Sequence, residues 1–289
     1  MHAPLSNRVV TRRHSRSPWE FAVVVALAAL LAALLTGCRT AADAMPSSAA
    51  QNEPGVRLPP EGGFDYQLGG AYDPPAGTTV IVRDSTASPP PGMYAVCYLN
   101  GFQSQPGSAG KWQGLLLEYE GAPVADPGWP DEFLLDTSDA SQRARIAERL
   151  ALEIRGCKQD GYAAVEFDNL DSYLRSHGAL DAGDNLALAD EYVAMAHREG
   201  LAVAQKNAAE LSARAQSLGF DFAVTEECGA YDECAEYASV YDIVLDVEYG
   251  TPAAFDALCA RGALPPHAVL RDRDLSPAGA PGHAHRRCA

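Results

Sequence analysis

Acidic residues are concentrated at the ends of three short apolar segments in the middle of the chain. They are Glu166, Asp168 and Asp171, then Glu226 and Glu227, then Asp246 and Glu248. Lys206 and Asn207 close a further apolar segment between the first two groups and supply a cation and an amide. Two carboxyl groups that face each other across a binding site can break a glycosidic bond, one as the acid and the other as nucleophile or base.

The alternation of side chains along a strand predicts which of these acids share a face. Glu166 and Asp168 lie on one side, and Val165 and Phe167 on the other. If the segments are parallel barrel strands, their carboxyl ends form the mouth where barrel enzymes place catalytic groups. Clustered acids raise one another's proton affinity, which suits a general acid, whereas Lys206 opposes that shift. The alternative is that the acids pair with Lys206, cap helices or bind an ion.

Eight apolar segments alternate with helix-like stretches, which is typical of a parallel sheet. They are Phe64–Leu68, Thr79–Arg83, Met93–Tyr98, Tyr162–Asp168, Leu201–Lys206, Asp221–Glu226, Asp242–Glu248 and Ala268–Arg271. We therefore predict a single α/β domain over residues 59–275, a TIM-like (β/α)8 barrel. Because no Gly-x-Gly-x-x-Gly follows the first segment and no phosphate-loop sequence occurs, we expect no nucleotide cofactor.

Helix signals separate several of these segments. One helix is predicted from Ser141 to Gly156, a second after a cap at Asp184, and a third over residues 208–218. Residues 101–135 are irregular, and we predict a long loop with one short helix that borders the binding cleft. Its Trp112 and Trp129 either stack on sugar rings or serve as a lid or local core.

Several of these motifs together resemble glycoside hydrolase family 114. They are Val165-Glu166-Phe167-Asp168-Asn169-Leu170-Asp171, Gln205-Lys206-Asn207 and Val224-Thr225-Glu226-Glu227-Cys228, with Tyr66 upstream and Tyr231 and Cys234 downstream. The resemblance spans about residues 64–275. It implies a TIM-like barrel and an endo-acting hydrolase of α-1,4-linked galactosamine or N-acetylgalactosamine polymers.

The resemblance also implies roles for individual residues. Asp168 and Glu226 match the positions expected to be catalytic, and a disulfide is implied between Cys228 and Cys234. The substrate-binding residues expected from these motifs are Tyr66, Glu166, Asn169, Asp171, Lys206, Asn207, Glu227 and Tyr231, and Glu248 is added because of its position at a strand end.

The chain departs from the family pattern at three places. Phe64 stands where many members have Trp, Ala208 where an acid is common, and Leu99-Asn100-Gly101 where a Ser-Ala-Gly-like loop is usual. These changes can alter sugar subsites without removing the central acids. They leave two rivals open: a polysaccharide-binding surface lipoprotein without turnover, and a structural envelope protein.

The N-terminus carries an export signal. Four arginines precede an apolar run that ends in Leu35-Thr36-Gly37-Cys38, which resembles a lipobox. We predict a signal peptide over residues 1–37, a lipidated Cys38 that anchors the protein to the outside of the cell membrane, and a flexible linker over 38–58. An uncleaved membrane anchor is the alternative. Residues 276–289 lack an apolar period and are predicted to be disordered.

Charge and cysteine content narrow the possible partners. A net charge of −16 disfavours nucleic acid and is compatible with a cationic substrate or simply with solubility. Seven cysteines, of which one is Cys38, leave an even number for disulfides in an oxidising compartment. The pairing of Cys97, Cys157, Cys259 and Cys288 stays open, with Cys97–Cys157 plausible. No spacing predicts a metal site, and we expect a monomer.

Overall fold

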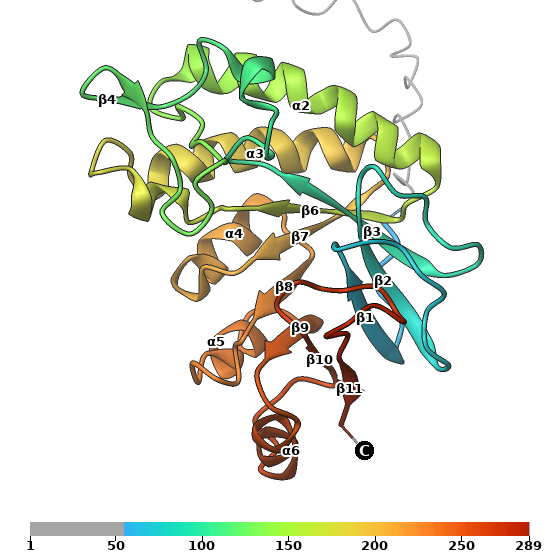
Figure 1. Ribbon diagram of the computed structural model, residues 1–289. Coiled ribbons are helices and arrows are strands. Elements are labelled where there is room, and N and C mark those ends of the chain that lie inside the picture. The colour runs from blue at the N-terminus through green and yellow to red at the C-terminus, as the bar shows by residue number, and fades with distance from the viewer. Residues whose placement is uncertain (1–54, 289) are drawn as a thin grey trace, which may run out of the picture. The chain divides into compact units, whose positions relative to one another are not determined.

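Nine strands form the main sheet of the protein, and eight of them run parallel to one another (Figure 1). The computed structural model describes residues 55–288. In sheet order the strands are β1 (Gly63–Gln67), β2 (Thr78–Asp84), β3 (Tyr94–Asn100), β6 (Ala164–Asp168), β7 (Ala202–Lys206), β8 (Phe222–Glu226), β9 (Val244–Tyr249), β10 (His267–Arg271) and the antiparallel β11 (His285–Arg287). All eight strands predicted from the apolar segments are therefore confirmed.

Helices cover the outside of this sheet unevenly (Figure 1). Those described are α2 (Ala140–Asp160), α3 (Ala182–Arg198), α4 (Ser212–Leu218), α5 (Cys234–Ala238) and α6 (Pro252–Ala260). They follow β3, β6, β7, β8 and β9, whereas β1 leads to β2, and β2 to β3, without a helix. The regular (β/α)8 repeat is therefore wrong. Both helix-free connections contain adjacent prolines, Pro74-Pro75 and Pro89-Pro90-Pro91, which cannot continue a helix.

The starts of α2 and α3 are set by aspartate caps. Asp139 accepts hydrogen bonds from the backbone of Ser141 and Gln142, so α2 begins where the sequence predicts. The predicted cap of α3 at Asp184 is wrong, because Asp181 is the cap and Asp184 completes the capping box from inside the helix. Asp181 and Asp184 are three residues apart, as the capping box requires. The helix therefore starts three residues earlier than predicted.

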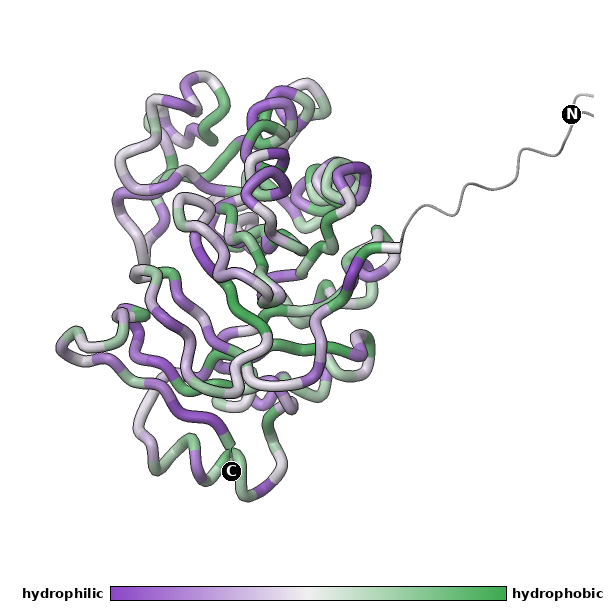
Figure 2. Tube along the Cα trace, turned by 90° about the vertical axis from the view of Figure 1, so that its right-hand side faces the viewer, coloured by the Kyte–Doolittle hydropathy of each residue, from purple (hydrophilic) through white to green (hydrophobic). Residues whose placement is uncertain are grey.

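The apolar residues form two layers, one inside the curved sheet and one between the sheet and its helices. In β6, Ala164 belongs to the inner layer, whereas Val165 and Phe167 belong to the outer layer. Phe167 stacks on Tyr192 of α3 with ring centroids 4.8 Å apart. Hydrophobic segments accordingly follow the strands through the centre of the molecule in Figure 2. The predicted alternation in this strand is confirmed.

Side chains close the barrel between β1 and β10. The buried guanidinium of Arg271 donates to Asp65 Oδ1 over 2.9 Å and to the carbonyl oxygen of Tyr66. On its other side Arg271 donates to Ala284 O over 2.9 Å. The described sheet is thus a nearly closed barrel. Between its first and eighth strands, β1 and β10, contacts of a charged side chain take the place of the backbone hydrogen bonds that join the other strands.

The C-terminal segment is ordered up to residue 288, so the prediction of a disordered tail is wrong there. Residues 285–287 form β11 on the edge of β10, Arg286 pairs with Asp256 of α6 over 2.6 Å, and Cys288 forms a disulfide with Cys259. Polar contacts and a disulfide fix this segment, and hydrophobic periodicity does not reveal either. The remaining cysteines pair as Cys97–Cys157 and Cys228–Cys234.

The connection from β3 to α2 is long, as predicted, and contains η1 (Ala109–Trp112) and the small hairpin of β4 (Glu118–Tyr119) and β5 (Ala122–Pro123). Trp112 is buried in the outer apolar layer, which makes it a core residue. Trp129 is 64% exposed. The two tryptophans of this loop therefore have different roles.

The predicted signal peptide (1–37), Cys38 and most of the linker (38–58) lie outside the described residues. Within residues 55–288, no helix has the length and hydrophobicity that a bilayer crossing needs.

Candidate active site

A cavity of about 390 Å³ opens at the carboxyl ends of the barrel strands. Its polar lining includes Tyr98, Glu132, Asp168, Asn169, Lys206, Glu226 and Tyr249. Asp168 and Glu226, the two predicted catalytic residues, close β6 and β8 and are both part of this lining. The cavity therefore lies where parallel barrels carry their active sites.

Lys206 is the centre of the site. Its Nζ lies 3.2 Å from Asp168 Oδ1, 3.2 Å from Glu226 Oε2 and 3.3 Å from Glu166 Oε1. The side chain is only 2% exposed. Burial lowers the pKa of Lys206, but the surrounding carboxylates, Asp168 foremost, outweigh it and raise the pKa well above its ordinary value. Lys206 is therefore a permanent cation that draws acids from two other strands together.

Asp168 is surrounded by hydrogen-bond donors. Tyr98 OH donates to Oδ2 over 2.6 Å, and the backbone N–H of Asn169 donates to Oδ1 over 2.8 Å. Burial raises the pKa of Asp168, but Lys206 and these donors outweigh it, so the pKa lies below its ordinary value. Asp168 therefore stays an anion at neutral pH, as a nucleophile requires.

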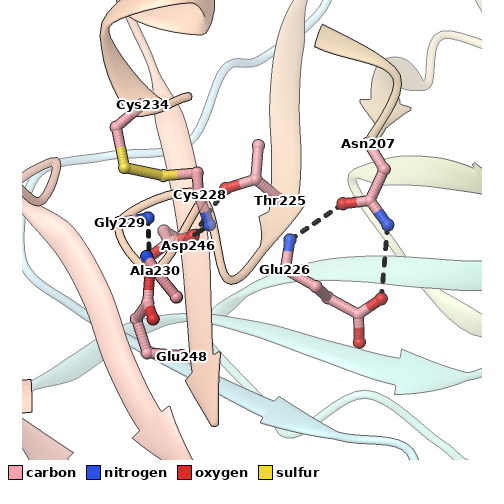
Figure 3. Close-up of a disulfide and its surroundings, with 9 residues drawn as sticks. All are labelled: Asn207, Thr225, Glu226, Cys228, Gly229, Ala230, Cys234, Asp246 and Glu248. Atoms are coloured by element: carbon pink, nitrogen blue, oxygen red, sulfur yellow. Dashed lines mark hydrogen bonds between the residues drawn. A yellow bond between two sulfur atoms is a disulfide. The ribbon is translucent and has the colours of Figure 1, made fainter. Parts of the chain in front are cut away.

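Glu226 is anchored by the neighbouring strands (Figure 3). Asn207 receives the backbone N–H of Glu226 on Oδ1 over 2.8 Å and donates from Nδ2 to Glu226 Oε2 over 3.3 Å. Tyr249 OH donates to the other carboxylate oxygen, Oε1. Asn207 adopts a left-handed φ of 47°, which asparagine tolerates better than most residues and which turns its amide toward β8. Asn207, which we predicted to belong to the site, therefore holds Glu226 in position.

Glu166 lies deeper than the two cavity acids and is fully buried. Tyr66 OH donates to its Oε1 over 2.8 Å and in turn receives Lys206 Nζ over 3.1 Å. Burial raises the pKa of Glu166 to about 7, against the opposing effect of Lys206. Neither Glu166 nor Tyr66 is part of the cavity lining, and both contact Lys206 from the interior of the barrel.

Phenols supply the neutral donors of the site. Burial, followed by neighbouring carboxylates, raises the pKa of Tyr66, Tyr98 and Tyr249 well above the ordinary value. They therefore remain protonated and donate to Glu166, Asp168 and Glu226 respectively. Tyr98 and Tyr249 were missed by the sequence analysis, because a tyrosine in an apolar strand carries no sign of the face on which it lies.

Seven of the nine predicted substrate-binding residues, including Tyr66, Glu166 and Asn207, lie outside the cavity lining. Asp171 is engaged by Arg175 of η2 (Ser172–Arg175), with its oxygens 2.9 and 3.0 Å from the guanidinium. Glu227 pairs with Arg273 over 2.9 Å, and Tyr231 is 67% exposed. Asn169, in contrast, lines the cavity and donates from Nδ2 to Asn100 Oδ1 over 3.0 Å.

Glu248 is the clearest correction to the predicted site. In β9, Leu245, Val247 and Tyr249 face the barrel interior, so Asp246 and Glu248 face outward. Glu248 Oε1 accepts the backbone N–H groups of Gly229 over 2.6 Å and Ala230 over 3.3 Å, beside the Cys228–Cys234 disulfide (Figure 3). The prediction that strand-end acids face the lumen is wrong here, because backbone N–H groups of the loop after β8 satisfy the outward carboxylate of Glu248.

Side chains that could bind a metal ion come together at one place outside the cavity in the described part of the chain. Among the described residues, the group of three is Cys228, Cys234 and Asp246, outside the cavity. Since the two sulfurs are joined in a disulfide, they offer no thiolate.

The chain was compared with known proteins. The sequence model of glycoside-hydrolase family GH114 matches residues 45–289. The crystal structure of Ega3 from Aspergillus fumigatus in complex with galactosamine is similar, with a TM-score of 0.63 and 19% identity over 78% of this chain and 97% of that one. The glycoside hydrolase domain of PelA from Pseudomonas aeruginosa gives a TM-score of 0.52 and 18% identity over 74% and 95%. No curated protein sequence matches the chain.

Proposed function

The chain belongs to glycoside-hydrolase family GH114, and from this premise we propose that it cleaves internal bonds of α-1,4-linked galactosamine or N-acetylgalactosamine polymers. The observation that carries the proposal is the pair of cavity acids, Asp168 and Glu226, on one buried ammonium. The similarity to Ega3, whose structure contains galactosamine, supports an amino-sugar substrate.

In the proposed mechanism Asp168 is the nucleophile. Its lowered pKa keeps it ionised, so it can attack the anomeric carbon as the glycosidic bond breaks. Glu226 enters the reaction in its protonated form, gives that proton to the leaving oxygen and then, as a base, takes one from the water that releases the sugar. Lys206 stabilises the negative charge that remains on the carboxylates at each stage.

The reaction in this proposal retains the configuration, and the distance between the nearest oxygens of the two acids is compatible with that outcome. Asp168 Oδ1 and Glu226 Oε2 each lie 3.2 Å from Lys206 Nζ, so they are at most twice that distance apart. Inverting enzymes separate their carboxyl groups by about 6.5–9.5 Å and retaining enzymes by about 5–5.5 Å. The stereochemistry of the first product, followed by proton NMR, should therefore be α. An initial β product would contradict the nucleophilic role of Asp168.

Hydrolysis tests the function itself. The purified protein is incubated with α-1,4-polygalactosamine and its partly and fully N-acetylated forms, and new reducing ends are measured. Wild type should release oligomers, whereas Asp168→Asn and Glu226→Gln should lose activity by about 10³-fold or more. The matched exposed variants Asp190→Asn and Glu118→Gln should remain active. Binding without release would favour a polysaccharide-binding lipoprotein, and equal activity in all variants would contradict the assigned site.

We also propose that the protein is exported and anchored by a lipid on Cys38. The support is the sequence of the leader, with its arginines and Leu35-Thr36-Gly37-Cys38. Wild type should partition with membranes and incorporate labelled palmitate in a bacterial host. Cys38→Ala should incorporate none, and equal labelling of the two proteins would contradict the anchor.

A further inference from the structure

A short turn at the rim of the cavity carries Trp129, one of the two tryptophans predicted to stack on a sugar or to form a lid or local core, and Glu132, which the sequence analysis did not identify. Trp129 is 64% exposed and Glu132 is half-buried, and both line the same cavity as Asp168 and Glu226. An exposed indole at the rim of a cavity offers a large apolar face on which a sugar ring can stack.

The turn is rigid because a buried acid organises it. Asp126 Oδ1 accepts the backbone N–H of Gly128 over 2.7 Å and of Trp129 over 3.2 Å. Asp126 is itself fixed by Arg175 over 2.6 Å and by the Gln103 amide over 2.7 Å. The backbone that carries Trp129 is therefore held in place, which lowers the backbone entropy lost on binding.

Glu132 is held in position by a series of hydrogen bonds that leads to Asp168. Its Oε2 accepts Asn100 Nδ2 over 2.9 Å, and Asn100 Oδ1 receives Asn169 Nδ2 over 3.0 Å. Asn169 continues this chain through its backbone N–H to Asp168. Asn100 is one of the positions at which the chain departs from the family pattern.

From these contacts we infer that Trp129 and Glu132 form a sugar subsite beside the cleavage point, in which the indole stacks on the ring and Glu132 binds the 2-ammonium group of galactosamine. The inference rests on the proposed function and sharpens it, because it selects the de-N-acetylated sugar at this position. An N-acetyl group carries no positive charge and would leave Glu132 without a counter-ion.

The electrostatics of Glu132 agree with a cationic ligand. Burial raises the pKa of Glu132 to about 7, with further repulsion from Asp168 and Asp126, while Asn100 and Arg175 oppose the rise. A bound ammonium would neutralise this carboxylate and add a charge-assisted hydrogen bond.

Binding in an inactive background tests the subsite independently of turnover. The full-length protein with Asp168→Asn is titrated by calorimetry with α-1,4-linked galactosamine hexamer and with its fully N-acetylated form. Adding Glu132→Gln should weaken binding of the galactosamine hexamer about tenfold, the loss of one charge-assisted hydrogen bond, and binding of the N-acetylated hexamer less than about twofold. Adding Trp129→Ala should weaken both hexamers, and Trp129→Phe should recover part of that loss.

The β4 hairpin of the same loop supplies matched controls. Glu118→Gln and Tyr119→Ala remove an exposed acid and an exposed aromatic ring outside the cavity, and they should leave both affinities unchanged. Equal weakening of the two hexamers by Glu132→Gln, no weakening, or no binding of the galactosamine hexamer would overturn the subsite. Intact binding with no hydrolysis by wild type would instead overturn the proposed hydrolase activity alone.

Discussion

At the scale of single residues, one lysine decides the chemistry of the site. Lys206 contacts three carboxylates from β6 and β8 and is almost completely buried. Removal of one partner from such a cluster leaves the others uncompensated in a medium of low dielectric constant. The charge balance of the site, and with it the ionisation of Asp168, therefore depends on this ammonium.

Replacement of the lysine should shift the pH profile. In Lys206→Met the pKa of Asp168 rises, because the ammonium that keeps it low is gone. We expect kcat/KM to fall about a hundredfold or more and its acidic limb to move to higher pH. The control is Lys111→Met, which removes an exposed lysine outside the cavity. A lower rate with an unmoved acidic limb would argue against this role.

Glu166 should make stability depend on pH. Its pKa rises from 4.5 to about 7 on folding, so the folded protein binds this proton more tightly than the unfolded chain. The stabilisation is complete below 4.5 and is lost as the pH rises through about 7. Asp168 has the opposite sign, and its contribution is lost only as the pH falls below 3.8.

Glu166→Gln mimics the protonated carboxyl and should flatten this dependence. The free energy of unfolding, measured by urea denaturation from about pH 5 to about pH 8, should fall less in the variant than in wild type. Glu132 contributes the same sign in both proteins and cancels in the comparison. Parallel curves for wild type and variant would contradict the raised pKa.

At the scale of elements, side chains on the two faces of the sheet have different tasks. Those that face the interior form the catalytic cavity, and those that face outward hold a loop in place. β8 sends Glu226 into the cavity, and the loop that follows is held by outward residues of β9. Asp246 accepts Thr225 Oγ1 over 2.7 Å and the Cys228 backbone N–H over 3.2 Å, and the Cys228–Cys234 disulfide closes the same loop (Figure 3). Asp246 and Glu248 of β9 thus hold in place the backbone that follows Glu226.

Glu248→Ala should therefore affect stability more than substrate binding. Loss of the acceptor for the Gly229 and Ala230 N–H groups should lower the free energy of unfolding by about 1–3 kcal/mol. KM should change by less than about twofold, since Glu248 does not line the catalytic cavity. The control is Glu236→Ala on the exposed side of α5. A large rise in KM with unchanged stability would restore Glu248 as a substrate-binding residue.

At the scale of the whole domain, its C-terminal end completes the barrel. Arg271 reaches from β10 to Asp65 of β1 and is held on its other side by Ala284 O and Ser276 O. The Cys259–Cys288 disulfide then ties the last described residue to α6. Without these acceptors a buried guanidinium would lose hydrogen bonds at the seam.

Removal of residues 276–289 should destabilise the domain. We expect the free energy of unfolding to fall by about 3 kcal/mol or more, from the lost disulfide and the lost acceptors of Arg271. Thermal unfolding followed by circular dichroism measures the change. The double variant Cys259→Ser/Cys288→Ser lacks only the disulfide and should lose less. Equal stability of the truncated and full-length proteins would show that this segment is dispensable.

The sequence by itself determined the parts of this protein that depend on local pattern. Apolar segments predicted all eight parallel strands, and alternation placed Glu166 and Asp168 on the face opposite Val165 and Phe167. Family motifs identified Asp168 and Glu226 as the two acids now found in one cavity. These features are readable because each depends on neighbours within a few residues.

Only the tertiary structure decided what depends on distant contacts. Both faces of β9 are buried, so the sequence did not distinguish the outward Glu248 from the inward Tyr249. Likewise, Glu132 enters the cavity through a loop, and the C-terminal segment is fixed by Arg271 and a disulfide. Such contacts join residues far apart along the chain, and no local periodicity encodes them.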